Sequence, residues 1–151
     1  MTARRWALAA AAVASLLAGC QGEDSTTDDP AAVTLTPVTG TPRFTVELSD
    51  QAVDRLGVRT KGVQQVSSKD QSLPAGSRLV VPYSGLIYDA DGSTWTYVQT
   101  AANTYTRHLV HVTSVVGSQA YLRSGPKSGT QVVVVGAPEL LGAEYQISGE
   151  E

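Results

Sequence analysis

The chain has 151 residues and a formal net charge of −3 at pH 7, with 17% charged residues and a single cysteine. The acidic balance argues against a nucleic-acid-binding protein, for which a basic face is expected. The length is sufficient for one domain with a hydrophobic core, and a single cysteine excludes an internal disulfide, so the domain must be stabilised by packing.

Residues 1–19 are predicted to be a secretory signal peptide. Arg4 and Arg5 form a short basic start, and the uncharged, alanine- and leucine-rich run Trp6–Leu17 follows them. A basic start, a short apolar run and a boundary of small residues are typical of such signals. The run is shorter than the roughly 20 residues that a membrane-spanning helix needs.

Cys20 stands where the sequence changes from apolar to polar. A nucleophilic cysteine would need a histidine and a structured pocket, and a disulfide would need a second cysteine. Leu17-Ala18-Gly19-Cys20 resembles the lipobox of bacterial lipoproteins. That resemblance implies cleavage before Cys20, attachment of a diacylglyceryl group to its thiol, and anchoring on the extracytoplasmic face of the cell membrane.

Residues 20–42 are predicted to be a disordered tether. The stretch is rich in Thr, Asp, Pro and Gly, and its "GEDSTTDD" segment carries four acids without an apolar residue. Such a composition buries too little apolar surface to offset the entropy cost of ordering the chain.

Order is predicted to begin at Arg43 with a strand, a helix of about two turns and a second strand. Apolar residues alternate over Phe44–Leu48, as in a half-buried strand. Ser49 suits an N-cap, and Gly57 suits the left-handed position that ends a helix. The second strand is expected over Val58–Val66.

A β-hairpin is predicted around Asp91-Gly92, a typical two-residue turn. That turn would place Tyr88 opposite Trp95 and Leu86 opposite Tyr97.

Further strands are expected after the hairpin, one spanning "YTRHLVHVTSV" and one in the apolar run "TQVVVVG" that suits burial on both faces. One helical turn is expected near "APELLGAEY", followed by a flexible acidic tail at residues 146–151. Short strands at regular intervals favour a mostly β fold, a small antiparallel barrel or sandwich with one short helix, over residues 43–145.

Few residues suggest chemistry. His108 and His111 are three apart, which on one strand places them on opposite faces and makes them poor joint metal ligands. Asp89 and Asp91 flank the hairpin turn, where aspartates are common for structural reasons. The sequence therefore predicts no catalytic residue, no cofactor and no metal site, and a hydrolase is disfavoured.

Binding is the favoured alternative to catalysis. Aromatic residues are concentrated in the β region, and most of them are expected in the core because the chain has a single Phe. An exposed remainder would form a contact patch. The aromatic residues concerned are Tyr83, Tyr88, Trp95, Tyr97, Tyr105 and Tyr121.

Two separated pieces of the chain resemble one family, the periplasmic adaptor subunits of efflux pumps, also called membrane fusion proteins. "FTVELSDQAVDRLGVRTKGV" is similar to the segment that enters their membrane-proximal domain. "LVVPYSGLIYDADGSTWTYV" and "YTRHLVHVTSVVGSQAYLRSGPKSGTQVVVVGAPELL" are similar to the returning strands of that domain. At Pro126 the family usually has Leu. The resemblance covers most of the range from Arg43 to Leu141.

The chain departs from the family between these pieces. Full adaptors carry a barrel domain, a lipoyl-like domain and a helical hairpin there, whereas here only the loop Ser67–Arg78 joins the pieces. Val66 and Leu79 are therefore expected at the ends of neighbouring strands.

The resemblance implies a membrane-proximal domain standing alone. Its expected role is a lipid-anchored accessory subunit of an integral membrane transporter that acts by protein–protein contact. The alternative is a ligand- or envelope-binding lipoprotein without a transporter partner.

Overall fold

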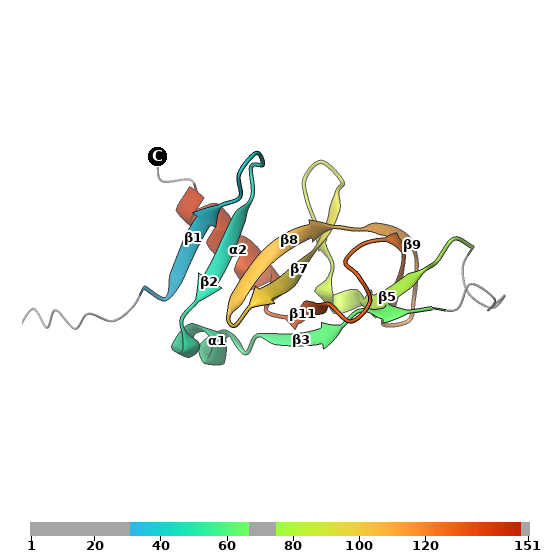
Figure 1. Cartoon of the computed structure of the whole chain (residues 1–151), viewed down its shortest axis with the longest axis horizontal. Coiled ribbons are helices and arrows are strands. Elements are labelled where there is room, and N and C mark those ends of the chain that lie inside the picture. Colours follow the sequence, from blue (N-terminus) through green and yellow to red (C-terminus); the bar gives the residue numbers. More distant parts are fainter. Residues whose placement is uncertain (1–30, 67–74, 149–151) are drawn as a thin grey trace, which may run out of the picture.

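The computed structural model describes residues 31–66 and 75–148 (Figure 1). The predicted signal peptide, Cys20 and the tether as far as residue 30 lie outside the described residues. The centre of the joining loop, residues 67–74, and the last three residues lie outside them as well.

The predicted fold class is confirmed: the chain forms two antiparallel sheets, packed as in a sandwich and not closed into a barrel. The larger sheet has the strand order β1-β2-β8-β7-β11-β3, with β6 also paired to β7. Its strands are β1 (Val33–Pro37), β2 (Phe44–Leu48), β3 (Arg59–Gly62), β6 (Ile87–Tyr88), β7 (Thr94–Ala101), β8 (Thr104–Leu109) and β11 (Gln131–Val135).

The smaller sheet has the order β4-β5-β10-β9 and lies at the end of the molecule away from β1 (Figure 1). Its strands are β4 (Gln64–Gln65), β5 (Leu79–Pro82), β9 (His111–Val116) and β10 (Gln119–Ser124). The helices are α1 (Asp50–Leu56), the 3₁₀ turn η1 (Tyr83–Gly85) and α2 (Ala137–Ser148).

Helix α1 is confirmed with its predicted caps. The Ser49 side chain accepts a hydrogen bond from the backbone N–H of Ala52 at 3.2 Å. Gly57 has φ 62°, the left-handed conformation that ends the helix, and the N–H of Val58 donates back to the carbonyl of Val53. These contacts satisfy backbone groups at both helix ends that would otherwise lack partners.

The predicted tether is too long at its C-terminal end. Val33–Pro37 forms the edge strand β1, which pairs with β2 from Val33 opposite Leu48 to Pro37 opposite Phe44. Its half-buried residues Val33 and Leu35 alternate and pack against the core. This strand was not predicted, because only two of its residues are apolar and the segment around it is rich in polar residues.

Two apolar clusters stabilise the fold, and β11 contributes to both. Val133 belongs to the cluster shared by the larger sheet and the two α-helices, whereas its neighbour Val132 belongs to the cluster shared with the smaller sheet. Both side chains have no exposed surface. The apolar run "TQVVVVG" was predicted to be buried on both faces. This holds at the centre of β11, whereas Val135 at the end of the strand is exposed.

The C-terminal helix is longer than the single turn expected. α2 extends over Ala137–Ser148, into the range predicted to be a flexible tail, and contacts β1 and β2. Leu140, fully buried, and the partly buried Leu141 belong to the larger-sheet cluster. Gly142 in the middle of the segment and the acidic sequence after it obscured the helical pattern. No helix of the described residues has the length and apolar character required to cross a membrane.

The hairpin turn is one residue longer than predicted. The N–H of Asp89 donates to the carbonyl of Ser93, and the N–H of Gly92 donates to the carbonyl of Asp89, which leaves a three-residue loop that ends at Gly92 with φ 84°. Three-residue loops with a left-handed glycine are the next commonest hairpin class. The extra loop residue shifts the register of the two strands.

Because of this shift, Ile87 and not Tyr88 faces Trp95, and Tyr88 faces Thr94. A register shift of one residue moves each side chain to the opposite face. Ile87 is accordingly in the core, and Tyr88 is 54% exposed. The predicted pair of Leu86 with Tyr97 is also wrong, since these residues belong to different apolar clusters.

The two pieces of the chain on either side of the joining loop form one folded unit, with β3 paired to β11 and β2 paired to β8. At the join, β4 pairs with β5, and Gln65 lies opposite Leu79. This pairing confirms that Val66 and Leu79 lie at the ends of neighbouring strands.

Candidate functional site

The two histidines lie on separate strands, which corrects the single strand predicted for that stretch. Val110, buried between β8 and β9, donates its N–H to the carbonyl of Thr94 and divides the run between two sheets. His108 Nδ1 lies 2.9 Å from the carbonyl of Leu109. Among the described residues, no group of three or more His, Cys, Asp or Glu side chains could hold a metal ion.

His111 Nδ1 lies 2.8 Å from Ser124 Oγ, the distance of a hydrogen-bonded serine–histidine pair. A catalytic histidine is normally oriented by a third group on its other ring nitrogen. Within residues 31–66 and 75–148, His111 has no such third partner. Both side chains are exposed, so the pair alone lacks the arrangement of a nucleophilic site.

The aspartates of the hairpin loop have structural contacts. Asp91 accepts a hydrogen bond from the N–H of Ser93 at 2.8 Å, and hydrogen bonds from Ser93 lower the pKa of its carboxyl. Asp89 binds Arg107 Nη1 at 3.2 Å and accepts a hydrogen bond from the hydroxyl of Tyr145. Both carboxylates therefore stabilise the loop and its attachment to β8 and α2.

Three of the six aromatic residues singled out in the sequence, Trp95, Tyr97 and Tyr105, are in or against the core. Tyr83 and Tyr88 of that set remain exposed, as does Tyr145 of α2. Tyr97 and Tyr105 are fully buried, whereas Tyr83 and Tyr88 are 45% and 54% exposed. Partial burial, followed by a hydrogen bond with Tyr83, raises the pKa of Tyr88. Tyr83 and Tyr88 are thus in contact, and we call them the tyrosine pair.

A buried ion pair holds helix α2 to the larger sheet. Glu144 and Arg107 are 1% and 5% exposed. Glu144 Oε1 accepts hydrogen bonds from Arg107 Nη2 and from the N–H of Phe44, each at 3.1 Å. Its Oε2 accepts from the hydroxyl of Tyr97 at 2.5 Å and lies 2.9 Å from Arg107 Nε. The carboxylate therefore has partners from β2, β7 and β8, and these hydrogen bonds compensate for its loss of hydration.

The same ion pair changes the chemistry of Tyr97. Burial, and then the hydrogen bond to the Glu144 carboxylate, raise the pKa of the Tyr97 hydroxyl far above its ordinary value. Arg43 and Arg107 lie 5.5 Å and 5.4 Å from the centre of the Trp95 ring. These contacts form a packed structural network.

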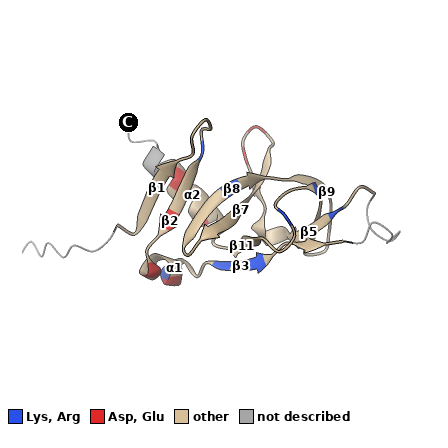
Figure 2. Ribbon diagram, viewed as in Figure 1, with Lys and Arg blue, Asp and Glu red and all other residues tan. Residues whose placement is uncertain are grey.

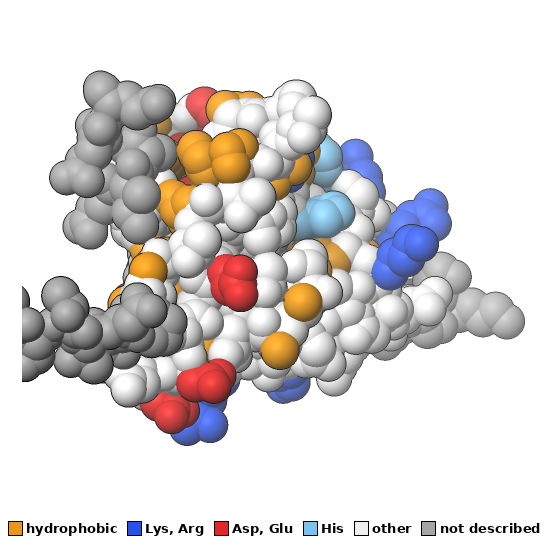
Figure 3. Space-filling model, turned by 60° about the vertical axis from the view of Figure 1, so that its left-hand side comes forward, with side chains coloured by type: hydrophobic (Ala, Val, Ile, Leu, Met, Phe, Trp, Pro, Cys, Tyr) orange, Lys and Arg blue, Asp and Glu red, His pale blue; other side chains and the backbone are white. Residues whose placement is uncertain are grey.

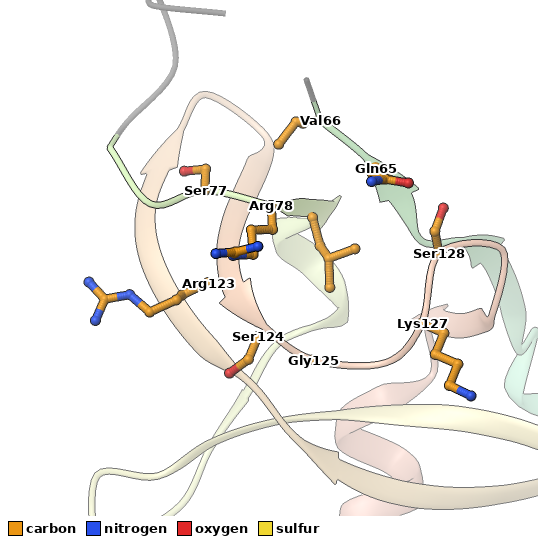
Figure 4. A pocket seen from close by; sticks show the side chains of 10 residues that line it. Gln65, Val66, Ser77, Arg78, Arg123, Ser124, Gly125, Lys127 and Ser128 are labelled. Carbon is orange, nitrogen blue, oxygen red and sulfur yellow. The ribbon is translucent and has the colours of Figure 1, made fainter. Parts of the chain in front are cut away.

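An open groove lies at the far end of the smaller sheet, with a volume of about 940 Å³. It is formed by the end of β4, the start of β5, the end of β10 and the loop before β11 (Figure 4). Its lining residues are Gln65, Val66, Ser77, Arg78, Leu79, Arg123, Ser124, Gly125, Lys127 and Ser128. Three of these are cationic, three are serines, and none is acidic.

Sequence reasoning did not find this groove, since its cations come from separate segments. Leu79 pairs with Leu122 across β5 and β10, and this pairing brings the segments that carry Arg78 and Arg123 to one side of the groove. One signal was present in the sequence: from His108 to Pro138 there is no carboxylate. A long acid-free stretch in an acidic chain indicates a separated patch of positive charge.

Comparison with protein-family models and with curated proteins found no match to this sequence.

Proposed function

We propose that this chain is a lipid-anchored, extracytoplasmic accessory subunit of an integral membrane transporter and acts by protein–protein contact. The observation that carries the proposal is the union of two adaptor-like pieces in one fold, with β3 paired to β11 and β4 paired to β5 across the short join. A membrane-proximal domain that stands alone must have its two pieces joined in one fold. A domain of this kind would act through its surface, where a partner can contact it.

The tyrosine pair is the best candidate for that contact. Tyr83 and Tyr88 are large, exposed and in contact with each other. Tyrosine is enriched among the residues that contribute most to protein–protein binding. Close to them, Ser84 donates a hydrogen bond to the carbonyl of Val134, which fixes the 3₁₀ turn to β11. The pair is therefore presented on a rigid part of the fold.

The experiment is chemical cross-linking of the membrane-anchored protein in its own cells, followed by purification and identification of what is bound. We expect an integral membrane transporter in the cross-linked product. Substitution of both Tyr83 and Tyr88 by Ser should abolish that product. The matched control replaces Val115 and Val116, two exposed residues of β9, by Ser and should leave it unchanged.

A transporter that is recovered equally well with the double tyrosine variant would contradict the proposed contact. Recovery of no membrane transporter would contradict the function itself. The second candidate function is that of a ligand-binding lipoprotein, and the observation on its side is the groove at the end of the smaller sheet. Recovery of a bound small molecule without a protein partner would support this second function.

A further inference from the structure

The groove at the end of the smaller sheet is lined by three cationic side chains. Among the described residues, the side chains of Arg78, Arg123 and Lys127 have no ion pair or hydrogen bond. All three are exposed. Figure 4 shows Arg78 near the middle of the lining side chains, with Lys127 on one side and Arg123 on the other. Their positive charge is accordingly available to a ligand.

Two of these cations come from neighbouring strands. Leu79 is opposite Leu122 in the β5–β10 ladder, and the N–H of Arg78 donates to the carbonyl of Leu122 at 2.8 Å. Arg78 just before β5 and Arg123 near the end of β10 therefore both line the groove. An anion in the groove would meet positive charge from both strands.

The smaller sheet carries positive charge and no described carboxylate. All described carboxylates lie in Glu47–Asp54, Asp89–Asp91 or Glu139–Glu144. Figure 2 shows the acidic residues on α1, α2, β2 and the hairpin loop, with basic residues also on α1 and β3 and beside β2, whereas near β5 and β9 only basic residues are drawn. In Figure 3, Lys and Arg side chains gather on the right-hand side beside the histidines, and no acidic side chain is visible there. Since the whole chain has a net charge of −3, the basic groove does not follow from its composition. Such separation creates a local positive potential that attracts anions.

The groove also holds a buried hydroxyl without a partner. Ser77 lines the groove, is 9% exposed, and its Oγ has no hydrogen-bond partner among the described residues. A buried polar group without a hydrogen bond costs about 1–3 kcal/mol. Two further hydroxyls of the lining have partners: Ser124 Oγ lies 2.8 Å from His111 Nδ1, and Ser128 Oγ donates to the carbonyl of Val63 at 3.4 Å. The exposed Ser124 hydroxyl can donate its proton to a ligand when His111 donates to its oxygen.

We propose that this groove binds a phosphate ester. A planar guanidinium matches two oxygens of a phosphate, an ammonium adds a compact positive charge, and serine hydroxyls donate to the remaining oxygens. A volume of about 940 Å³ holds a whole phosphorylated molecule and not merely an ion. The site is independent of the proposed transporter contact, because Tyr83 and Tyr88 do not line it.

The phosphate could be presented by a soluble ester or by the headgroup of an anionic lipid. The groove lies at the opposite end of the molecule from β1, the strand nearest to Cys20 in the sequence (Figure 1). This placement favours the soluble ester, and the experiment below separates the two sources.

The first experiment uses the full mature lipoprotein in nonionic detergent micelles. Equilibrium dialysis measures binding of labelled glycerol 3-phosphate, with labelled glycerol as the uncharged comparison. We expect saturable binding of glycerol 3-phosphate that weakens as salt is added, and none of glycerol. Absence of saturable binding of glycerol 3-phosphate would overturn the proposal.

Charge-removing variants locate the site. Arg78→Gln and Lys127→Gln should each weaken binding by about tenfold or more, since each loses a charge-assisted contact. Arg59→Gln is the matched control, because Arg59 is an exposed cation of β3 that does not line the groove. Circular dichroism checks that each variant is folded. Equal weakening by all three variants would overturn a discrete site in favour of diffuse charge attraction.

The second experiment identifies the source of the phosphate. The lipoprotein is reconstituted into vesicles of phosphatidylcholine alone or with phosphatidylglycerol, at about 0.15 M salt, where surface charge is screened within about 8 Å. Equal binding of glycerol 3-phosphate in both vesicles supports a soluble ester. Weaker binding of glycerol 3-phosphate in the vesicles that contain phosphatidylglycerol than in phosphatidylcholine alone supports a lipid headgroup. Absence of binding in both vesicles would contradict the site in the membrane-anchored protein.

Discussion

The backbone N–H of Val66 donates a hydrogen bond to the carbonyl of Arg78 at 3.0 Å, across the two ends of the joining loop. The ladder continues inward with Gln65 opposite Leu79 and Gln64 opposite Val80. The ends of the joining loop are therefore held together by the sheet itself, and the loop has no need to bring them together.

We predict that the join tolerates insertion. Replacing residues 67–74 by a Gly/Ser segment of twice their length should lower the free energy of unfolding by only about 0.6 kcal/mol, because loop-closure entropy grows slowly with length. Thermal unfolding of the two proteins measures the difference. Loss of cooperative unfolding in the longer variant would show that the join has a structural role beyond connection.

Glu144→Gln should be strongly destabilising. The substitution leaves the buried Arg107 guanidinium without its charged partner, and removing one member of a buried pair typically costs about 3–5 kcal/mol. Denaturant unfolding measures the change. Glu139→Gln, at an exposed position in the first turn of the same helix, is the control and should cost less than about 1 kcal/mol. Similar losses in both variants would contradict the role of the ion pair.

Two glycine-to-alanine substitutions should have opposite effects. Gly57 has φ 62°, which an alanine adopts at a cost of about 1 kcal/mol. Gly142 lies within α2, and a Cβ there would meet nothing within 4 Å. Gly142→Ala should therefore stabilise the protein by roughly 0.5–1 kcal/mol. Midpoints of thermal unfolding measure both effects, and a shift in the same direction would contradict this account.

Stability should decrease in alkali through Tyr97. Its folded-state pKa is raised above that of the unfolded chain, so the folded protein retains a proton that the unfolded chain releases. This contribution to stability is fully present below pH of about 10 and is lost above it, by up to about 1.4 kcal/mol per pH unit.

The measurement is the pH dependence of unfolding free energy for the wild type and for Tyr97→Phe. The variant, which has no hydroxyl to ionise, should show a shallower decline at alkaline pH. Part of the decline in unfolding free energy should remain in the variant, because burial also raises the pKa of Tyr105. Identical slopes for the two proteins would show that Tyr97 does not titrate between the folded and unfolded states.

Cys20→Ser should release the protein from the membrane or leave it unprocessed, since stable anchoring by lipid requires acyl chains attached at this position. Cell fractionation with detection of the mature N-terminus measures the outcome. A processed Cys20→Ser protein that still needs detergent for extraction would contradict lipidation at Cys20.

Local signals in the sequence predicted local structure well. Ser49 and Gly57 mark the ends of α1 because a cap needs only residues within one turn of each other. The hairpin register was missed because Asp89 and Ser93 pair one residue outside the expected turn, and turn residues alone do not distinguish two-residue from three-residue loops.

Contacts between distant segments were beyond sequence reasoning. Glu144 reads as one more acid near an acidic tail, and only the packing of α2 on β2 and β8 gives it buried partners. The groove likewise depends on the pairing of β5 with β10, which brings the segments of Arg78 and Arg123 into one lining. The exception is the join, where a loop of limited reach required Val66 and Leu79 to lie close together.

The contact between Phe44 and Glu144 also limits how early the chain can complete its fold during synthesis. These residues are 100 positions apart, and the carboxylate sits on the last helix of the chain. β2 pairs with β8 in addition to the nearby β1, and β3 pairs with β11, so both strands need segments that are synthesised much later. Folds with contacts of large sequence separation form slowly. The larger sheet and its buried ion pair therefore cannot be completed until the C-terminal helix has been synthesised.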